Sequence, residues 1–168
     1  MTSVAQVLKS KPNQDVYTIE AADSVYNAIK LMAEKQIGAL IVKENGAIAG
    51  IVTERDYARK VILQDKASRT TTVCEIMTAP VKSVRLRTST DECMALMTQH
   101  RIRHVPVIEG GRLLGMVSIG DMVRHLIEEQ QFAIDQLESY VRGPRHETPT
   151  CALTRRTPIP QTLEVRFA

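Results

Sequence analysis

The chain contains an internal duplication, and this feature constrains its fold more than any other. When the sequence is shifted by 65 residues, residues 24–62 fall on residues 89–127. Random sequences of average composition would share about two or three of the positions that match here. Two copies of one unit are therefore expected to bury their cores together, since a unit of about 55 residues buries little surface alone. The identical pairs are Ser24/Ser89, Leu31/Leu96, Met32/Met97, Ile37/Ile102, Val42/Val107, Glu44/Glu109, Gly46/Gly111, Gly50/Gly115, Val52/Val117, Asp56/Asp121, Arg59/Arg124 and Ile62/Ile127.

Each copy predicts the same order of elements, β-α-β-β-α. A polar residue at Ser24 or Ser89 is suited to cap the first helix, and apolar residues then recur at helical spacing. Asn45-Gly46 is a strong hairpin signal between two apolar strands, and the second copy has glycines at the same place. The expected strands cover 16–19, 39–42 and 48–52 in the first copy and 81–84, 104–108 and 113–117 in the second. The closing helices are expected over 56–63 and 121–129.

This pattern predicts an α/β (α+β) fold in which two repeats, 1–65 and 73–130, pack sheet against sheet about a pseudo-twofold axis. Nearly continuous apolar strands fit buried sheets. Apolar residues from Phe132 to Val141 predict a C-terminal helix over 131–142, ended by Gly143-Pro144. Residues 145–168 contain three prolines and no clear period, so they are expected to be irregular or disordered.

Composition excludes several classes of protein. Aromatic residues make up 4% of the chain and Trp is absent, so the core must be aliphatic. No apolar run approaches the roughly 20 residues of a membrane span, and no signal peptide is recognisable, which favours a cytoplasmic protein. The three cysteines, Cys74, Cys93 and Cys151, fit free thiols. The sequence contains no CxxC motif, so a zinc site is not indicated. The net charge of +3 comes from arginines after residue 140, which fits a solvated tail better than a nucleic-acid surface.

One motif carries chemistry. Gly-h-h-Thr/Ser-x-x-Asp, where h is apolar, occurs at residues 50–56 and again at 115–121, where a strand runs into a helix N-terminus. Free backbone N–H groups and the helix dipole favour an anion there. Thr53 and Ser118 can donate to a phosphate, and Asp56 and Asp121 can accept from ribose hydroxyls, as the acidic residue of dinucleotide folds does. The alternative is that these side chains only cap their helices.

The doubled motif, the helices ending in Leu-Met (31–32 and 96–97) and His-Val-Pro-Val (104–107) together resemble the cystathionine-β-synthase (CBS) domain family, specifically its tandem pair or Bateman module. The resemblance extends from Val4 to about Glu129, and the continuation at 53–62 is similar to the stand-alone two-domain group of bacteria and plant organelles. It implies adenosine ligands in clefts between the paired repeats, a homodimer, and regulation of a partner protein that the sequence does not identify.

Carried onto this chain, the resemblance places ribose on Asp56 and Asp121, and ribose or phosphate on Thr53 and Ser118. One adenine would lie between segments 16–19 and 37–40, the other between 81–84 and 102–105. The side chains and backbone expected at these adenine positions are those of Val16, Thr18, Ile37, Ala39, Val81, Ser83, Val105 and Pro106.

The two copies differ in charge. Arg55 in the first motif corresponds to Gly120 in the second, and Arg103-His104 in the second copy correspond to Gly38-Ala39 in the first. Arg55, Arg103 and His104 are therefore expected to converge on a shared phosphate, for which Arg offers bidentate contacts. An exposed, solvated turn is the alternative for Arg101 and Arg103. One mono- or diphosphate is favoured over two triphosphates.

The favoured ligands are therefore AMP and NAD, with ADP, ATP and S-adenosylmethionine as alternatives, and no metal is predicted, since a helix-to-strand break separates His100 from His104. An enzyme is disfavoured because no nucleophile–base constellation is recognisable. The alternative function is a dimerisation scaffold whose clefts bind no ligand.

Overall fold

The structure, a computed structural model, describes residues 2–142. The described part of the chain divides after Gln131, and the unit before this point holds both repeats. The first repeat comprises β1 (Thr18–Glu20), α2 (Val25–Lys35), β2 (Ala39–Glu44), β3 (Ala47–Thr53), α3 (Glu54–Lys60) and the 3₁₀ turn η1 (Ile62–Gln64). The second comprises α5 (Thr90–His100), β4 (His104–Glu109), β5 (Arg112–Ser118) and the first part of α6 (Ile119–Arg142).

Local signals in the sequence set the ends of these elements. The Ser24 hydroxyl accepts a 3.2 Å hydrogen bond from the Asn27 N–H, and the Ser89 hydroxyl accepts one of 3.1 Å from the Glu92 N–H. These bonds satisfy N–H groups that the first turn of a helix leaves unpaired. In the first hairpin, Asn45 and Gly46 both have positive φ, of 52° and 79°, which is the conformation that a two-residue hairpin turn requires. Both predicted caps and the hairpin are confirmed.

The two sheets differ in size. In the first, β2 is central: β1 pairs with it in parallel and β3 antiparallel. The second sheet consists of the antiparallel pair β4 and β5, where the counterpart of β1 is reduced to one parallel bridge between Val84 and Val107. The strand predicted over 81–84 therefore pairs at Val84 alone, while Lys82 and Ser83 are exposed.

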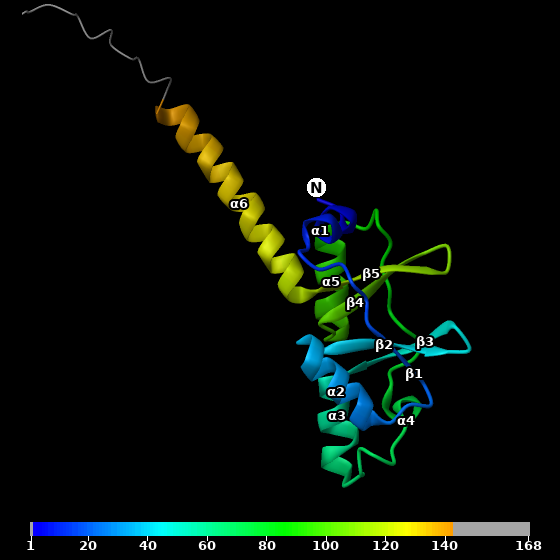
Figure 1. Ribbon diagram of the computed structural model, residues 1–168. Helices are drawn as coiled ribbons and strands as arrows, with labels where there is room; N and C mark the ends of the chain where they lie inside the picture. The colour runs from blue at the N-terminus through cyan, green and yellow to red at the C-terminus, as the bar shows by residue number, and fades with distance from the viewer. Residues whose placement is uncertain (1, 143–168) are drawn as a thin grey trace, which may run out of the picture. The chain divides into compact units, whose positions relative to one another are not determined.

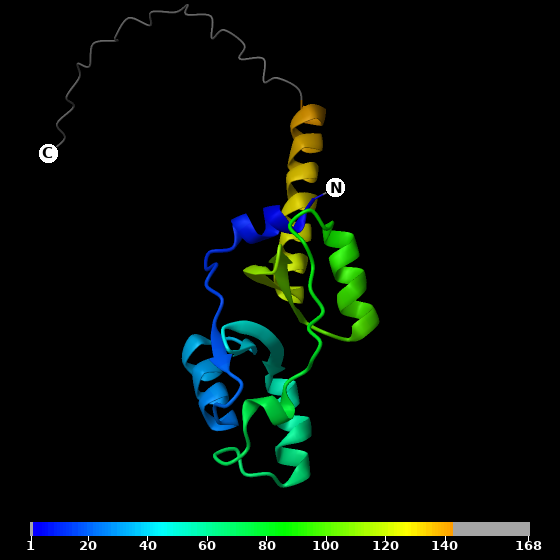
Figure 2. The same ribbon diagram turned by 90° about the vertical axis from the view of Figure 1, so that its right-hand side faces the viewer.

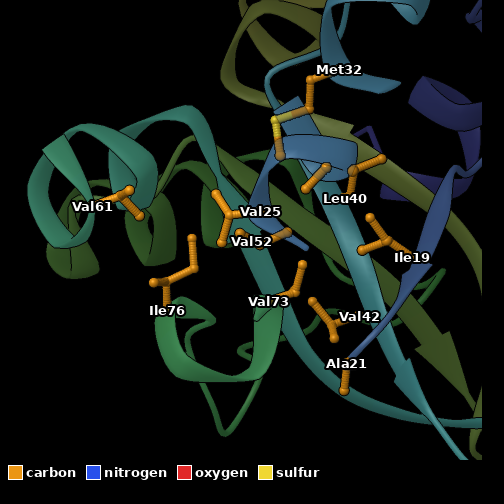
Figure 3. Packing of buried hydrophobic residues seen from close by; sticks show 11 residues of the cluster. Ile19, Ala21, Val25, Met32, Leu40, Val42, Val52, Val61, Val73 and Ile76 are labelled. Atoms are coloured by element: carbon orange, nitrogen blue, oxygen red, sulfur yellow. The ribbon is translucent and has the colours of Figure 1, made fainter. Parts of the chain in front are cut away.

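The core of each repeat is completed by a short helix that precedes the other repeat. Helix α1 (Val4–Ser10) inserts Val4, Val7 and Leu8 into the aliphatic cluster of the second repeat. Helix α4 (Val73–Ile76) inserts Val73 and Ile76 into the cluster of the first. Figure 1 shows α1 beside β5, and Figure 2 shows the segment that follows α1 crossing to β1. Figure 3 shows Val73 and Ile76 pointing into the same cluster as Leu40, Val42 and Val52.

Equivalent backbone hydrogen bonds hold the two exchanged helices. The Val4 N–H donates to the Thr88 carbonyl at 2.9 Å, and the Val73 N–H donates to the Asp23 carbonyl at 2.8 Å. Thr88 and Asp23 are counterparts in the duplication. The pseudo-twofold relation predicted between the repeats therefore extends to the segments that precede them.

Helix α6 runs without interruption from Ile119 to Arg142, where two successive helices over 121–129 and 131–142 were predicted. No Gly or Pro occurs between Asp121 and Arg142, so the sequence has no helix stop there. Among the described residues, no helix is both long and apolar enough to cross a membrane. The segment expected to be irregular, 145–168, and Cys151 lie outside the described residues.

Two glycines allow the exchanged segments to approach the strands. A Cβ atom on Gly50 would lie 2.6 Å from Met77 Sδ and 3.1 Å from the Thr78 carbonyl oxygen. A Cβ on the equivalent Gly115 would lie 2.8 Å from Leu8 Cδ2. Only the contact at Gly50 involves the backbone, which itself is held by two hydrogen bonds between Ile51 and Thr78.

We predict that Gly50→Ala lowers the free energy of unfolding by about 1–3 kcal/mol, because the methyl group has to displace backbone as well as a side chain. Gly115→Ala should cost less, since the end of Leu8 can rotate away. Gly120→Ala is the matched control, because its Cβ would lie 3.7 Å from its nearest neighbour, Ser118 Oγ. Urea denaturation measures all three. Equal stability of the Gly50 and Gly120 variants would contradict the close approach.

Candidate functional site

Both copies of the Gly-h-h-Thr/Ser-x-x-Asp motif form capping boxes at the start of α3 and α6. The Thr53 hydroxyl donates to Asp56 Oδ2 at 2.6 Å, and the Asp56 N–H donates back to Thr53 Oγ1 at 3.2 Å. The Ser118 hydroxyl donates to Asp121 Oδ2 at 2.8 Å, and the Asp121 N–H donates to Ser118 Oγ at 3.2 Å. The capping interpretation of the motif is therefore realised in both copies. These bonds also fix the position of each carboxylate.

A lysine pairs with each of the two motif carboxylates. Lys60 Nζ lies 2.8 Å from Asp56 Oδ1, four residues earlier on α3. Lys11 Nζ lies 3.0 Å from Asp121 Oδ2 and comes from the segment after α1. Both ammonium groups also donate to backbone carbonyls, Lys60 to Ile76 at 2.6 Å and Lys11 to Met116 at 2.9 Å. The two aspartates remain largely buried, with side chains 13% and 14% exposed.

Asp121 is held in its ionised form. Burial raises the pKa of this carboxyl, but hydrogen bonds from the Ser118 side chain and backbone and from Lys11, together with the charge of Lys11, outweigh burial. The net result is a pKa below the usual value for aspartate. An ionised carboxylate is an acceptor for hydroxyl groups at neutral pH, which is the chemistry required to hold a ribose.

A pocket of about 290 Å³ brings residues of both repeats together next to Asp121. We call it the tyrosine pocket. Val16 and Tyr17, which precede β1, and Ile37, Gly38 and Ala39 at the start of β2 provide one wall, and Ser118 with Asp121 provides the other. The complete lining is Lys11, Asp15, Val16, Tyr17, Gln36, Ile37, Gly38, Ala39, His104, Met116, Ser118 and Asp121.

A second pocket, of about 460 Å³, contains the motif of the first repeat and is here called the arginine pocket. Arg55 and Arg103, which were predicted to converge, both line it. Arg55 Nη1 also donates to the Arg101 carbonyl at 2.6 Å, which ties α3 to the turn before β4. The complete lining is Gly38, Ile51, Thr53, Glu54, Arg55, Asp56, Arg59, Thr78, His100, Arg101, Ile102, Arg103 and His104.

Gly38 and His104 line both pockets. Burial lowers the pKa of the His104 imidazole, the charge of Asp121 acts in the opposite direction, and the charges of Lys11, Arg103 and Arg55 lower it further. The net pKa lies below the ordinary value of about 6.5. His104 is therefore neutral at physiological pH in the wall between the two pockets.

The remaining residues predicted for the site lie elsewhere. Val105 and Pro106 are buried in β4, and Thr18 is half-buried in β1. Val81 is half-buried, and Ser83 lines a separate cavity with Arg85 and Glu92. None of these five residues lines the tyrosine or the arginine pocket. The adenine wall expected from segment 81–84 is thus not part of the arginine pocket.

Several residues at the site were not predicted from the sequence: Lys60, which pairs with Asp56, and the pocket residues Tyr17, Lys11 and Glu54. Lys60 could have been found, because it follows Asp56 at the spacing at which helical side chains pair. Tyr17 lies inside a segment that was predicted, although its side chain was not singled out. Glu54 lies inside the motif, between Thr53 and Arg55, and was not singled out. Lys11 carries no local signal, since its position at the pocket depends on the packing of distant segments.

The thiol of Cys93 belongs to the core of the second repeat. Its side chain is buried, and burial raises its pKa to about 11. A thiol with this pKa is a poor nucleophile at neutral pH, in agreement with the structural role predicted for it. Within residues 2–142, no group of three or more His, Cys, Asp or Glu side chains is arranged to hold a metal ion.

We predict that the protein loses stability as the pH falls below about 6.5. His104 takes up a proton less readily in the folded chain than in the unfolded chain, so acid favours unfolding, with a slope of up to about 1.4 kcal/mol per pH unit for one proton. Urea denaturation between pH 7.5 and 5.5 measures this slope. His104→Gln should reduce it, whereas the exposed His100→Gln is the control and should not. An unchanged slope in the His104 variant would contradict the prediction.

Comparison with known proteins agrees with this organisation. The family model of the CBS domain matches residues 4–62 and 73–128. A curated relative, the mitochondrial CBS domain-containing protein CBSX3 of Arabidopsis thaliana, is 41% identical over 150 residues, which cover 84% of this chain and 73% of the relative.

Two solved structures extend the comparison. A protein with CBS domains from Burkholderia ambifaria, assigned to signal transduction, is 60% identical with a TM-score of 0.75, and the match covers 77% of this chain and 96% of that protein. A hexameric CBS-CP12 protein from bloom-forming cyanobacteria is 34% identical with a TM-score of 0.66, over 73% of this chain and 70% of that protein. The chain belongs to the CBS domain family and carries two tandem copies of the domain, as expected for a regulatory protein of this family.

Proposed function

We propose that the chain is a regulatory module that binds an adenine nucleotide between its two repeats and thereby controls a partner protein. AMP and NAD remain the favoured ligands from the sequence, with ADP, ATP and S-adenosylmethionine as alternatives. The observation that carries this proposal is the tyrosine pocket, in which an apolar wall from the first repeat faces an ionised carboxylate from the second.

Each part of the tyrosine pocket suits one part of a nucleoside. Val16, Tyr17 and Ile37 offer apolar and aromatic surface to a purine, and Asp121 offers an acceptor to ribose hydroxyls. Small-molecule sites are commonly of this kind, mostly apolar with a few well-placed polar groups. Because the two walls come from different repeats, a bound nucleoside would be held by both.

Regulation follows from this arrangement. A ligand that contacts both repeats stabilises the arrangement in which they are paired. If the surface seen by a partner differs between arrangements, the ligand changes the affinity for that partner by its differential binding energy. A separate catalytic role has no support from Cys93, whose thiol is buried with a raised pKa. We therefore propose a module without catalysis of its own.

We predict that one or more of AMP, ADP, ATP, NAD and S-adenosylmethionine raises the melting temperature by several degrees at a concentration of about 100 times its Kd, since such binding adds about 2.7 kcal/mol. Differential scanning fluorimetry measures the shift. Asp121→Asn should abolish most of it, because the amide offers a weaker acceptor to the ribose. Asp91→Asn, on the exposed start of α5, is the matched control. No shift with any of these ligands would overturn the proposal.

A ligand-free dimerisation scaffold is the alternative function. It is favoured by the observation that Asp56 and Asp121 already cap a helix and pair with a lysine, so neither carboxylate needs a ligand for its presence to be explained. In that case the protein would be stable and fully assembled without nucleotide, and none of the ligands above would shift its melting temperature.

We further propose that the module forms a homodimer through exposed apolar side chains, Ile62 in the turn η1 that follows α3 and Ile127 within α6. Ile62 and Ile127 are counterparts in the duplication and are 54% and 59% exposed. Equivalent apolar positions in two repeats offer a matching surface to a second copy, and closed twofold pairs are the commonest assembly of soluble proteins. The hexameric relative shows that assembly occurs among similar chains.

We predict that the wild-type chain elutes as a dimer and that the double variant Ile62→Asp, Ile127→Asp elutes as a monomer, because carboxylates cannot be buried unpaired at an interface. Size-exclusion chromatography with light scattering measures the mass. Leu114→Asp, at an exposed apolar position on β5, is the control and should remain dimeric. A monomeric wild type, or a dimeric double variant, would contradict this interface.

A further inference from the structure

We propose that the two pockets hold one adenosine phosphate between them, with the nucleoside in the tyrosine pocket and its phosphates in the arginine pocket, rather than one nucleotide each. This inference rests on the proposed function and assigns the orientation and the number of ligands. It departs from the symmetry of the duplication, which by itself suggests two equivalent sites.

The two motif aspartates differ in the acceptor capacity that remains for a ribose. Asp56 uses both carboxylate oxygens: Oδ2 accepts from the Thr53 hydroxyl and N–H, and Oδ1 accepts from Lys60 at 2.8 Å and from the Thr78 hydroxyl at 3.4 Å. Asp121 accepts all its contacts on Oδ2, from the Ser118 hydroxyl and N–H and from Lys11. Among the described residues, Oδ1 of Asp121 has no hydrogen-bond partner. It is the oxygen available to ribose hydroxyls.

The walls opposite the two aspartates differ as well. The tyrosine pocket has the apolar and aromatic side chains of Val16 and Tyr17, which lie just before a strand that pairs with β2 over three residues. The corresponding segment of the second repeat pairs at Val84 alone and does not line the arginine pocket. A purine therefore has a wall to pack against in the tyrosine pocket and lacks the equivalent wall in the arginine pocket.

The arginine pocket is suited to anions instead. Arg55, Arg59, Arg101 and Arg103 line it, against the carboxylates of Glu54 and the Lys60-paired Asp56. Arginine offers planar, bidentate donors that match phosphate oxygens. Of these four arginines, Arg101 and Arg103 correspond to Gln36 and Gly38 in the first repeat, and Arg55 corresponds to Gly120 in the second. The cationic character thus belongs to one pocket of the pair.

Gly38 lies where the two pockets adjoin and has no side chain there. It lines both pockets, and a Cβ atom at this position would lie 3.2 Å from Glu54 Oε2 and 3.5 Å from His104 Cε1. Its counterpart in the second repeat is Arg103, so the two copies differ in whether this position carries a side chain. Gly38 and His104 are the shared wall across which a single ligand would extend.

Isothermal titration calorimetry of the full chain with adenosine, AMP and ADP tests this arrangement. We expect one ADP per chain, and an affinity for ADP at least about tenfold above that for adenosine. Arg103→Gln should remove most of this gain while leaving adenosine affinity within about twofold. Arg112→Gln, at an exposed arginine outside both pockets, is the matched control and should leave both affinities unchanged.

The aspartates provide the second comparison. Asp121→Asn should weaken adenosine and ADP alike by about tenfold or more, whereas Asp56→Asn should change the adenosine affinity by no more than about threefold. Gly38→Ala should weaken ADP more than adenosine, since only ADP crosses the boundary that Gly38 lines. The melting temperature of each variant, compared with wild type, shows whether it folds.

Binding of two ADP molecules per chain, or an equal loss of adenosine affinity in the Asp56 and Asp121 variants, would overturn the single-ligand arrangement while leaving the proposed function in place. Equal affinities for adenosine and ADP would do the same, because the arginines would then contribute nothing. Failure of all three ligands, and of NAD and S-adenosylmethionine, to bind at all would instead remove the proposed function.

Discussion

The exchange of α1 and α4 between the repeats is the constraint on which the rest of the structure depends. Neither sheet is covered by residues of its own repeat alone: Val4, Val7 and Leu8 complete the second core, and Val73 and Ile76 complete the first. The exchange also positions the site. The segment that leads from α1 to β1 carries Lys11 to Asp121 of the second repeat and Tyr17 to the pocket that this aspartate lines.

The motif at the start of α3 and α6 combines a structural and a chemical role in the same atoms. A helix N-terminus requires acceptors for its free N–H groups, and the Thr or Ser hydroxyl meets this need. The aspartate three residues later closes the reciprocal bond and is thereby held at the pocket. Because the cap already uses Oδ2, only Oδ1 of each aspartate can accept a hydrogen bond from a ligand. The two copies differ here: Oδ1 of Asp56 already accepts from Lys60 and Thr78, whereas the contacts of Asp121 with other described residues are all on Oδ2.

Much of the fold could be predicted because its signals are local. The caps at Ser24 and Ser89 and the Asn45-Gly46 turn depend on a few neighbouring residues, and the duplication supplied each of these signals twice. The length of a strand depends less on neighbouring residues, because each strand residue needs a partner strand at the right register to pair with. For this reason the strand predicted over 81–84 is reduced to Val84. The single helix α6 was missed although the absence of Gly and Pro between Asp121 and Arg142 is visible in the sequence.

The chemistry of the candidate site was only partly accessible in the same way. Ser118, Asp121 and Arg103 were singled out from the motif and from the charge differences between the copies. The sequence does not show that the apolar wall of one repeat faces the motif of the other, because that depends on the exchange of helices. Nor does it show that Lys11 reaches Asp121, at a separation of more than a hundred residues.

The exchange of helices has a consequence for the order in which the chain acquires structure. As the chain leaves the ribosome, α4 follows the first repeat closely and covers its core soon after β3 appears. Helix α1 is made long before the strands it covers, so Val4, Val7 and Leu8 remain without a packing partner until β5 is complete. Contacts between segments so distant in sequence form slowly. The second half of the module is therefore the last to fold, and the groove that both halves share is formed only then.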